Sequence, residues 1–316
     1  MNLENLNPQQ LQAVQHDEGP LMVVAGAGSG KTRVITCRIA NLIQEKQASP
    51  ESILAITFTN KAAGEMKERV RNMLDFRGAS PWISTFHSFC LRILRKHISE
   101  LGFSNDFAVY DAQDQLTLVK QCMKVKEISA DAFPPKTLLN HISSFKNDFL
   151  MPEDVKQEEI PYGHQHKAAG LYPVYQAALK KNNALDFDDL LVFAGRLFQE
   201  VPNLQRHYSE KFKYIMVDEF QDTNAAQYKL VRLLSETHKN ICVVGDDDQS
   251  IYRWRGANIE NILKFENDYP GTTVIKLEEN YRSTQNILNA AGSVVKENKN
   301  RKDKTLWTQN EKSSPV

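Results

Sequence analysis

Short runs of apolar and β-branched residues recur along the chain and predict buried strands. They are LMVVA from Leu21, ILAITF from Ile53, WISTF from Trp82, YIMV from Tyr214, ICVV from Ile241 and TVIKL from Thr273. Between the first two runs, TRVITCRIANLI places apolar residues at helical spacing, and KAAGEMKERVRNML does the same after the second. Strands alternating with helices predict an α/β domain with one parallel sheet.

The stretch from about Phe89 to Phe212 interrupts this alternation. It shows helical periodicity, as in DQLTLVKQCMKV, and its prolines divide it into short helices. We interpret it as a helical insertion.

Composition narrows the classes of function. With 316 residues and 41% hydrophobic positions, the chain can bury a substantial core, and its length favours about two domains. Its formal charge of zero means that any contact with DNA is local, because nucleic-acid-binding modules are generally basic. The four cysteines have no paired spacing that would indicate zinc or disulfides. With neither a leader nor an apolar run of about 20 residues, we expect a cytoplasmic protein without a membrane partner.

The segment AGAGSGKT follows the first predicted strand and precedes a helix. Its three glycines permit a tight turn whose backbone N–H groups surround a phosphate, at the positive end of that helix. Lys31 supplies a charge for the terminal phosphates and Thr32 a hydroxyl for Mg²⁺. Ala25 stands where the general P-loop pattern has glycine. A glycine-rich turn that binds nothing is the alternative, but strand, loop, Lys-Thr and helix occur in the required order.

Two acids, Asp218 and Glu219, come directly after the predicted strand YIMV. Beside a P-loop, this position suits an Asp218 carboxylate that holds Mg²⁺ and a Glu219 carboxylate that polarises the attacking water.

Several segments resemble superfamily 1 DNA helicases of the UvrD, PcrA and Rep type. They are LNPQQLQAV, AGAGSGKT, ITFTNKAAGEM, STFHS, VDEFQDTN, VGDDDQSIYRWRGA and LEENYRST, in family order. The family's P-loop also begins with alanine. The resemblance implies a RecA-like P-loop NTPase fold and an ATP-dependent helicase that moves 3′ to 5′ along single-stranded DNA and acts at junctions with duplex DNA.

The resemblance also implies roles for single residues at the ATP site. Gln10 would read the adenine edge, with Arg33 and Tyr281 on either side of the ring. Gln249 would sense the γ-phosphate, and Arg282 would serve as an arginine finger. The phosphates and Mg²⁺ would be held by the P-loop residues Ala25, Gly26, Ala27, Gly28, Ser29, Gly30, Lys31 and Thr32.

On the DNA side, the resemblance implies that aromatic residues stack on bases without regard to sequence. The implied contacts are Phe58, Thr59, Asn60, His87, Tyr252, Trp254 and Arg255. Core packing is the alternative for Phe58 and Tyr252, and a structural role is the alternative for His87.

By analogy, residues 1–88 and 213–278 form the first motor domain, residues 89–212 the helical insertion, and residues 279–316 the start of a second motor domain. We expect Tyr281 and Arg282 to be loosely held on that short segment, so that the chain alone hydrolyses ATP slowly. Two other hypotheses remain: the motor arm of a helicase–nuclease, and a DNA-binding module without enzymatic activity. Repair or replication proteins are possible partners, but the sequence identifies none.

Overall fold

The computed structural model describes residues 4–74, 79–253, 256–298 and 302–311. The chain divides into two compact units. The first, called the sheet unit, comprises Met1–Thr85, Arg206–Thr223 and Leu234–Val316. The second, called the helical unit, comprises Phe86–Gln205 and Asn224–Leu233.

The sheet unit contains six parallel strands in the order β3-β2-β6-β7-β1-β8. They are β1 (Leu21–Ala25), β2 (Ile53–Thr57), β3 (Trp82–Thr85), β6 (Tyr214–Val217), β7 (Ile241–Gly245) and β8 (Thr273–Leu277). Each strand falls on one of the predicted apolar runs, which confirms the predicted α/β fold with a parallel sheet. Every residue of the inner strands β1, β2, β6 and β7 is buried, and this explains why they are continuously apolar.

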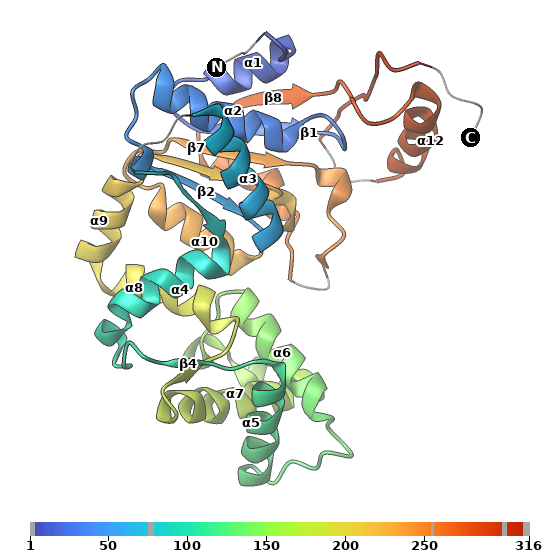
Figure 1. The fold of residues 1–316 in the computed structure, drawn as a ribbon. Coiled ribbons are helices and arrows are strands. Elements are labelled where there is room, and N and C mark those ends of the chain that lie inside the picture. Colours follow the sequence, from blue (N-terminus) through green and yellow to red (C-terminus); the bar gives the residue numbers. More distant parts are fainter. Residues whose placement is uncertain (1–3, 75–78, 254–255, 299–301, 312–316) are drawn as a thin grey trace. The chain divides into compact units, whose positions relative to one another are not determined.

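Helices α1 (Pro8–Gln15), α2 (Lys31–Gln44) and α3 (Asn60–Met73) run along one face of this sheet (Figure 1). Alternate strand residues such as Leu21 and Val23 form the core beneath them, because successive side chains of a strand point to opposite faces. The Thr59 hydroxyl accepts a hydrogen bond from the Ala62 N–H and so begins α3 at the end of β2. Helices α11 (Glu260–Asp268) and α12 (Gln285–Val295) also belong to this unit.

The helical unit is formed by α4 (Phe86–His97), α5 (Ala112–Val125), α6 (Pro135–Asn147), α7 (His164–Lys181), α8 (Asp189–Glu200) and most of α10 (Ala225–Leu234). Helix α9 (Pro202–Lys211) contains residues of both units. Two short strands, β4 (Ala108–Val109) and β5 (Ala184–Leu185), pair in parallel. The core lies among α5, α6 and α7, where Tyr172 and Tyr175 are fully buried.

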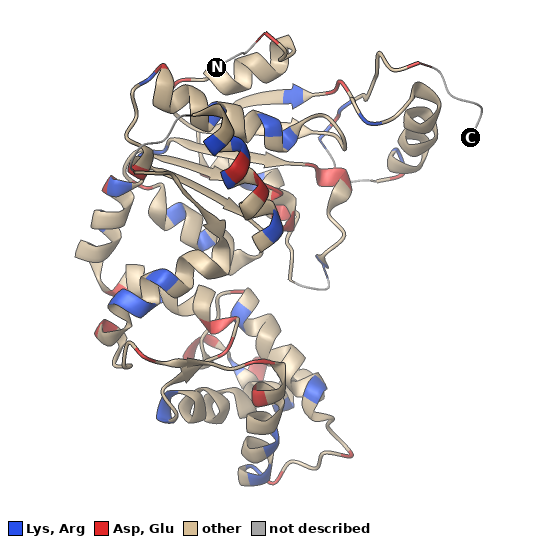
Figure 2. Cartoon of the chain, in the orientation of Figure 1, with Lys and Arg blue, Asp and Glu red and all other residues tan. Residues whose placement is uncertain are grey.

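Charged residues are spread over both units. Figure 2 shows Lys and Arg interleaved with Asp and Glu on the helices. Among the helices that the structure describes, none has the length and hydropathy that a membrane crossing requires.

Candidate nucleotide and DNA site

The glycine-rich loop connects β1 to α2 at the carboxyl edge of the sheet. Gly28 and Gly30 have φ angles of 71° and 87°, in the left-handed region that favours glycine. The Ser29 hydroxyl donates a hydrogen bond of 2.7 Å to the Gly26 carbonyl and so closes the turn. Lys31 is the first residue of α2, so the loop lies at the positive end of that helix. This is the geometry in which backbone N–H groups bind a phosphate.

The acids after β6 lie at the same edge of the sheet. Glu219 has a φ of 49°, uncommon for a residue other than glycine, and its Oε2 lies 3.5 Å from the Lys31 Nζ. Burial raises the pKa of Asp218 to about 7 and the charge of Glu219 adds to this, whereas hydrogen bonds from the Glu219 N–H and the Thr32 hydroxyl oppose the rise. A buried carboxylate beside a hydroxyl offers the oxygen ligands that Mg²⁺ prefers. Asp218 and Thr32 therefore fit the predicted metal site.

A hydrogen-bonded relay joins Glu219 to Gln249. The Gln221 amide donates to the Glu219 Oε2 at 2.9 Å, and its Oε1 accepts from the Asp246 N–H at 2.9 Å. The Asp246 carboxylate in turn accepts a hydrogen bond from the Gln249 amide. Gln221 is only 1% exposed, so its orientation is fixed by these partners. Sequence analysis missed Gln221 and Asp246, although both lie inside the quoted motifs VDEFQDTN and VGDDDQSIYRWRGA.

Asp246, Asp247 and Asp248 follow β7 as three consecutive carboxylates. Their oxygens lie within 4.8 Å of one another, close enough to hold a metal ion. The Lys304 ammonium lies among them, at 2.9, 2.5 and 2.6 Å from Asp246, Asp247 and Asp248. A lysine of this chain therefore supplies the cation, and residues 302–311 are tied to the turn that carries Gln249.

The residues predicted to contact adenine come from α1, α2 and the segment after β8. Gln10 is fully buried, and its Nε2 donates to the Ser29 carbonyl at 2.9 Å. The side chain of Asn7, which begins α1, donates to the Tyr281 hydroxyl at 2.9 Å. Arg33 is close enough for its charge to lower the pKa of Tyr281, although burial and a hydrogen bond to Glu279 raise that pKa to about 12. Gln10, Arg33 and Tyr281 are thus brought together.

The backbones of Tyr281 and Arg282, which we expected to be loosely held, contact the P-loop in the structure. The Tyr281 N–H donates to the Gly28 carbonyl at 3.0 Å. A Cβ at Gly28 would lie 2.7 Å from the Arg282 Cβ. The first side-chain atom of Arg282 therefore packs directly against the P-loop. The physical reason is a second link: residues 305–308 run beside residues 278–280, with a hydrogen bond of 2.8 Å from the Asn280 N–H to the Trp307 carbonyl.

The residues assigned to DNA contact fall into both units. Phe58 is half-buried and Thr59 and Asn60 are exposed at the end of β2, while Tyr252 is 38% exposed after β7. Neither the Phe58 ring nor the Tyr252 ring is therefore fully buried in the core. Trp254 and Arg255 lie outside the described residues. His87 belongs to the helical unit, where burial lowers its pKa to about 4 and so keeps the ring neutral near pH 7.

Comparison with known proteins bears on this arrangement. A sequence profile described as the UvrD/REP helicase N-terminal domain matches residues 6–270. The chain belongs to the UvrD/REP helicase family. A second profile, the UvrD-like helicase C-terminal domain, matches residues 275–316. The family assigned from the sequence motifs is therefore confirmed.

Sequence identity to individual proteins supports the membership of the UvrD/REP family. The chain is 52% identical over 314 residues to the ATP-dependent DNA helicase PcrA of Bacillus subtilis (strain 168). The aligned region covers 99% of this chain and 42% of that protein. The chain is 51% identical over 308 residues to the PcrA of Staphylococcus aureus (strain NCTC 8325 / PS 47), covering 98% of this chain and 42% of the relative. The chain thus spans less than half the length of these curated relatives.

Sequence analysis of this UvrD/REP family member also missed Phe187. Its side chain is 52% exposed, and its ring stacks on His87 with 3.9 Å between centroids and 19° between planes. His87 is therefore part of an aromatic pair in the helical unit. The sequence signal was weak, because a phenylalanine in LDFDDLL reads as an ordinary apolar residue beside three acids.

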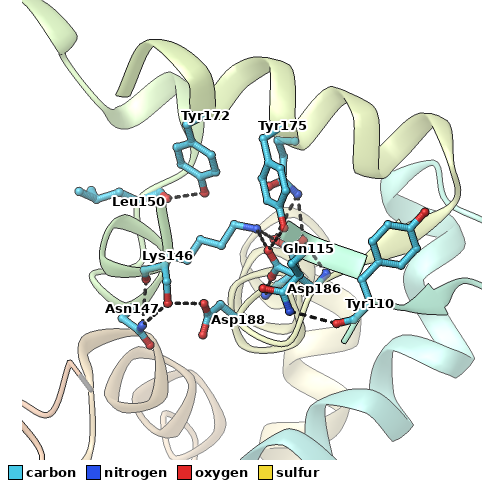
Figure 3. A network of polar contacts seen from close by, with 12 residues as sticks. Tyr110, Gln115, Lys146, Asn147, Leu150, Tyr172, Tyr175, Asp186 and Asp188 are labelled. Atoms are coloured by element: carbon cyan, nitrogen blue, oxygen red, sulfur yellow. Dashed lines mark hydrogen bonds and ion pairs between the residues drawn. The ribbon is translucent and has the colours of Figure 1, made fainter. Parts of the chain in front are cut away.

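A buried polar network in the helical unit includes Lys146, Tyr175 and Asp186, the residue before Phe187 (Figure 3). The Lys146 Nζ lies 2.6 Å from the Asp186 Oδ2 and 2.8 Å from the Asp189 Oδ1, and the Tyr175 hydroxyl donates to Asp186 at 3.0 Å. Lys146 and Asp189 are both 0% exposed. Since Asp186 precedes Phe187 and Asp189 follows two residues later, the network fixes the backbone on both sides of the exposed ring.

Proposed function

We propose that this chain is the ATP-binding portion of a DNA helicase, which binds MgATP and single-stranded DNA and couples hydrolysis to movement 3′ to 5′ along the strand and to duplex unwinding at junctions. The observation that carries the proposal is the convergence of Lys31, Thr32, Asp218 and Glu219 at one edge of the sheet, with Gln249 joined to them through Gln221 and Asp246.

In this proposal the ATP site works through positioning and electrostatics. The Lys31 ammonium binds the terminal phosphate and leaves the Glu219 carboxylate, its partner in the structure. Glu219 is then free to orient the attacking water. Thr32 and Asp218 would hold Mg²⁺, which would supply positive charge to neutralise the phosphate oxygens. Gln249 and Arg282 approach the γ-phosphate, where negative charge develops in the transition state.

The DNA contacts are proposed to be stacking contacts with Phe58, Tyr252 and Trp254 and polar contacts with Thr59, Asn60 and Arg255. The His87 and Phe187 pair adds an aromatic surface in the helical unit. Each base stacked on an aromatic ring contributes about 1–3 kcal/mol without sequence preference, as a motor that passes every base requires.

The domain boundaries stay as proposed from the motifs: a motor domain of residues 1–88 and 213–278, an insertion of residues 89–212, and the start of a second motor domain at residue 279. The match of residues 275–316 to a helicase C-terminal domain supports the last boundary. We also propose that the protein works in the cytoplasm, because the relatives named above are DNA helicases of bacteria.

Single-turnover hydrolysis tests the proposed activity. The chain, in excess over labelled ATP, is followed with and without Mg²⁺ and with and without a single-stranded oligonucleotide. We expect Mg²⁺-dependent hydrolysis that Glu219→Gln slows by about 100-fold or more while nucleotide affinity is kept. Hydrolysis at the same rate in the Glu219→Gln variant would remove Glu219 from the mechanism, and a lack of nucleotide binding by the wild-type chain would refute the proposed function.

A further inference from the structure

Asn280 occupies a buried position between the P-loop and Arg282. It lies three residues after β8 and is 2% exposed. Its backbone is held on both sides, because its N–H donates to the Trp307 carbonyl at 2.8 Å and its carbonyl accepts from the Thr308 hydroxyl at 2.6 Å. The residue is therefore anchored independently of its side chain.

The side chain of Asn280 makes hydrogen bonds in two directions. Its Oδ1 accepts from the backbone N–H groups of Arg282 and Ser283, at 2.8 and 2.7 Å. Its Nδ2 donates to the Ala27 carbonyl at 2.5 Å. The two partners fix the orientation of the amide, since the reverse orientation would set its NH₂ group against two N–H donors and its oxygen against a carbonyl.

We propose that Asn280 is a positioning residue that sets Arg282 relative to the P-loop. The inference rests on the proposed ATPase function. It gives a role to Asn280, which lies inside the motif LEENYRST but received no role in the sequence analysis. The acceptor half of the amide shapes the turn that leads to Arg282, and the donor half fastens this turn to the backbone that surrounds the phosphates. Gly28 completes the contact, because a Cβ there would lie 2.9 Å from the Asn280 Nδ2.

The chemistry needs this link because an arginine finger acts on charge that develops only in the transition state. Misplacement of a catalytic group by about 1 Å can cost about 100-fold in rate. A covalent path from Ala27 to Arg282 runs through more than 250 residues, whereas the path through Asn280 consists of one side chain. Removal of the Asn280 amide therefore takes away the side-chain link between the P-loop and the turn that leads to Arg282, and leaves backbone contacts such as the hydrogen bond from the Tyr281 N–H to the Gly28 carbonyl.

A double-variant cycle tests this proposal in the 316-residue chain. Asn280→Ala, Arg282→Ala and the double variant are compared in MgATP affinity and in single-turnover hydrolysis, with Asn105→Ala, an exposed turn asparagine in the helical unit, as the matched control. We expect Asn280→Ala to keep the MgATP Kd within about threefold and to slow hydrolysis by about 10- to 100-fold. In the Arg282→Ala background, the Asn280→Ala change should slow hydrolysis by less than about threefold, because the effects of residues that act as a unit are not additive.

A second variant covers the case in which Asn280→Ala does not fold. Asn280→Asp keeps the acceptor for Arg282 and Ser283 but sets a carboxylate oxygen against the Ala27 carbonyl. Its loss of rate should also disappear when Arg282 is alanine. If its added charge acted on the phosphates instead, the loss would persist in that background and the proposal would be overturned.

Two further results would overturn it: hydrolysis at the wild-type rate by either Asn280 variant, and rate losses that multiply with that of Arg282→Ala. Failure of the wild-type chain to bind or hydrolyse MgATP is a different outcome, since it refutes the proposed function itself.

Discussion

Replacing Lys146 with methionine removes an ammonium group from a buried cluster of carboxylates. Lys146 is 0% exposed and lies within 2.8 Å of Asp186 and Asp189. Methionine keeps most of the volume of the side chain, so the loss of packing is small. The main effect is that buried carboxylates lose their counter-charge.

The expected loss of stability is about 3–5 kcal/mol, the range measured when one partner of a buried ion pair is removed. The matched control is Lys264→Met, because Lys264 pairs with Glu260 on the surface and its side chain is 63% exposed. An exposed pair of this kind contributes less than about 1 kcal/mol. The difference between the two variants therefore isolates the effect of burial.

The loss should depend on pH. Burial raises the pKa of Asp189 to about 7, and the charge of Asp186 adds to this, whereas Lys146 opposes it. Between the unfolded pKa and the raised folded pKa, the folded state holds a proton that the unfolded state has released, so stability falls as pH rises through this window. Without Lys146 the folded pKa rises further. The loss in free energy of unfolding caused by Lys146→Met should therefore be larger at pH 8 than at pH 5.

Hydrogen exchange of the α7 amides reports the stability of the helical unit by itself, once the rates are corrected for the pH dependence of intrinsic exchange. A urea titration gives the free energy of unfolding of the whole chain. The added change Asp189→Asn should recover part of the stability of Lys146→Met, because it removes one of the uncompensated charges. A loss under 1 kcal/mol, or an equal loss at pH 5 and pH 8, would refute the reasoning from buried charge.

Three other outcomes are expected. Phe187→Ala should weaken binding of single-stranded DNA by about 1–3 kcal/mol, measured by fluorescence anisotropy, with unchanged MgATP affinity; equal DNA affinity would return Phe187 to a packing role. Tyr252→Ala should reduce DNA-stimulated ATP hydrolysis more than the basal rate, and a uniform reduction of both rates would contradict a stacking role. The 316-residue chain should not separate a 3′-tailed duplex in a strand-displacement assay with excess ATP, because we propose that residues 279–316 are only the start of a second motor domain and that unwinding needs two such domains to close and reopen; robust unwinding would contradict that proposal.

The strands and the P-loop could be predicted because their signals are local. A parallel sheet buried on both faces requires continuous apolar runs, and each of the six runs became a strand. The turn conformation at Gly28 and Gly30 is likewise set by the residues of the loop itself. The resemblance to the family then supplied proposed roles for distant residues such as Tyr281.

The contacts that complete the site could not be predicted in this way. The Gln221 amide meets the Asp246 N–H across two strands, and the Asn280 amide meets the Ala27 carbonyl across most of the chain. Such pairs depend on strand order, which no local pattern specifies. Lys146 shows the same limit, because a lysine in an amphipathic helix reads as a surface charge until the fold buries it.

Equilibrium binding of MgATP to the 316-residue chain and to its Lys31→Ala variant tests the central claim most directly. Lys31 is the proposed phosphate-binding cation, and its Nζ lies 3.5 Å from the Glu219 carboxylate, its partner in the structure. The account predicts saturable, Mg²⁺-dependent binding by the wild-type chain and an affinity at least about tenfold lower in the variant, since a hydrogen bond to a charged group contributes about 1.5–3 kcal/mol. Equal affinity in the two proteins, or no binding by the wild-type chain, would contradict it.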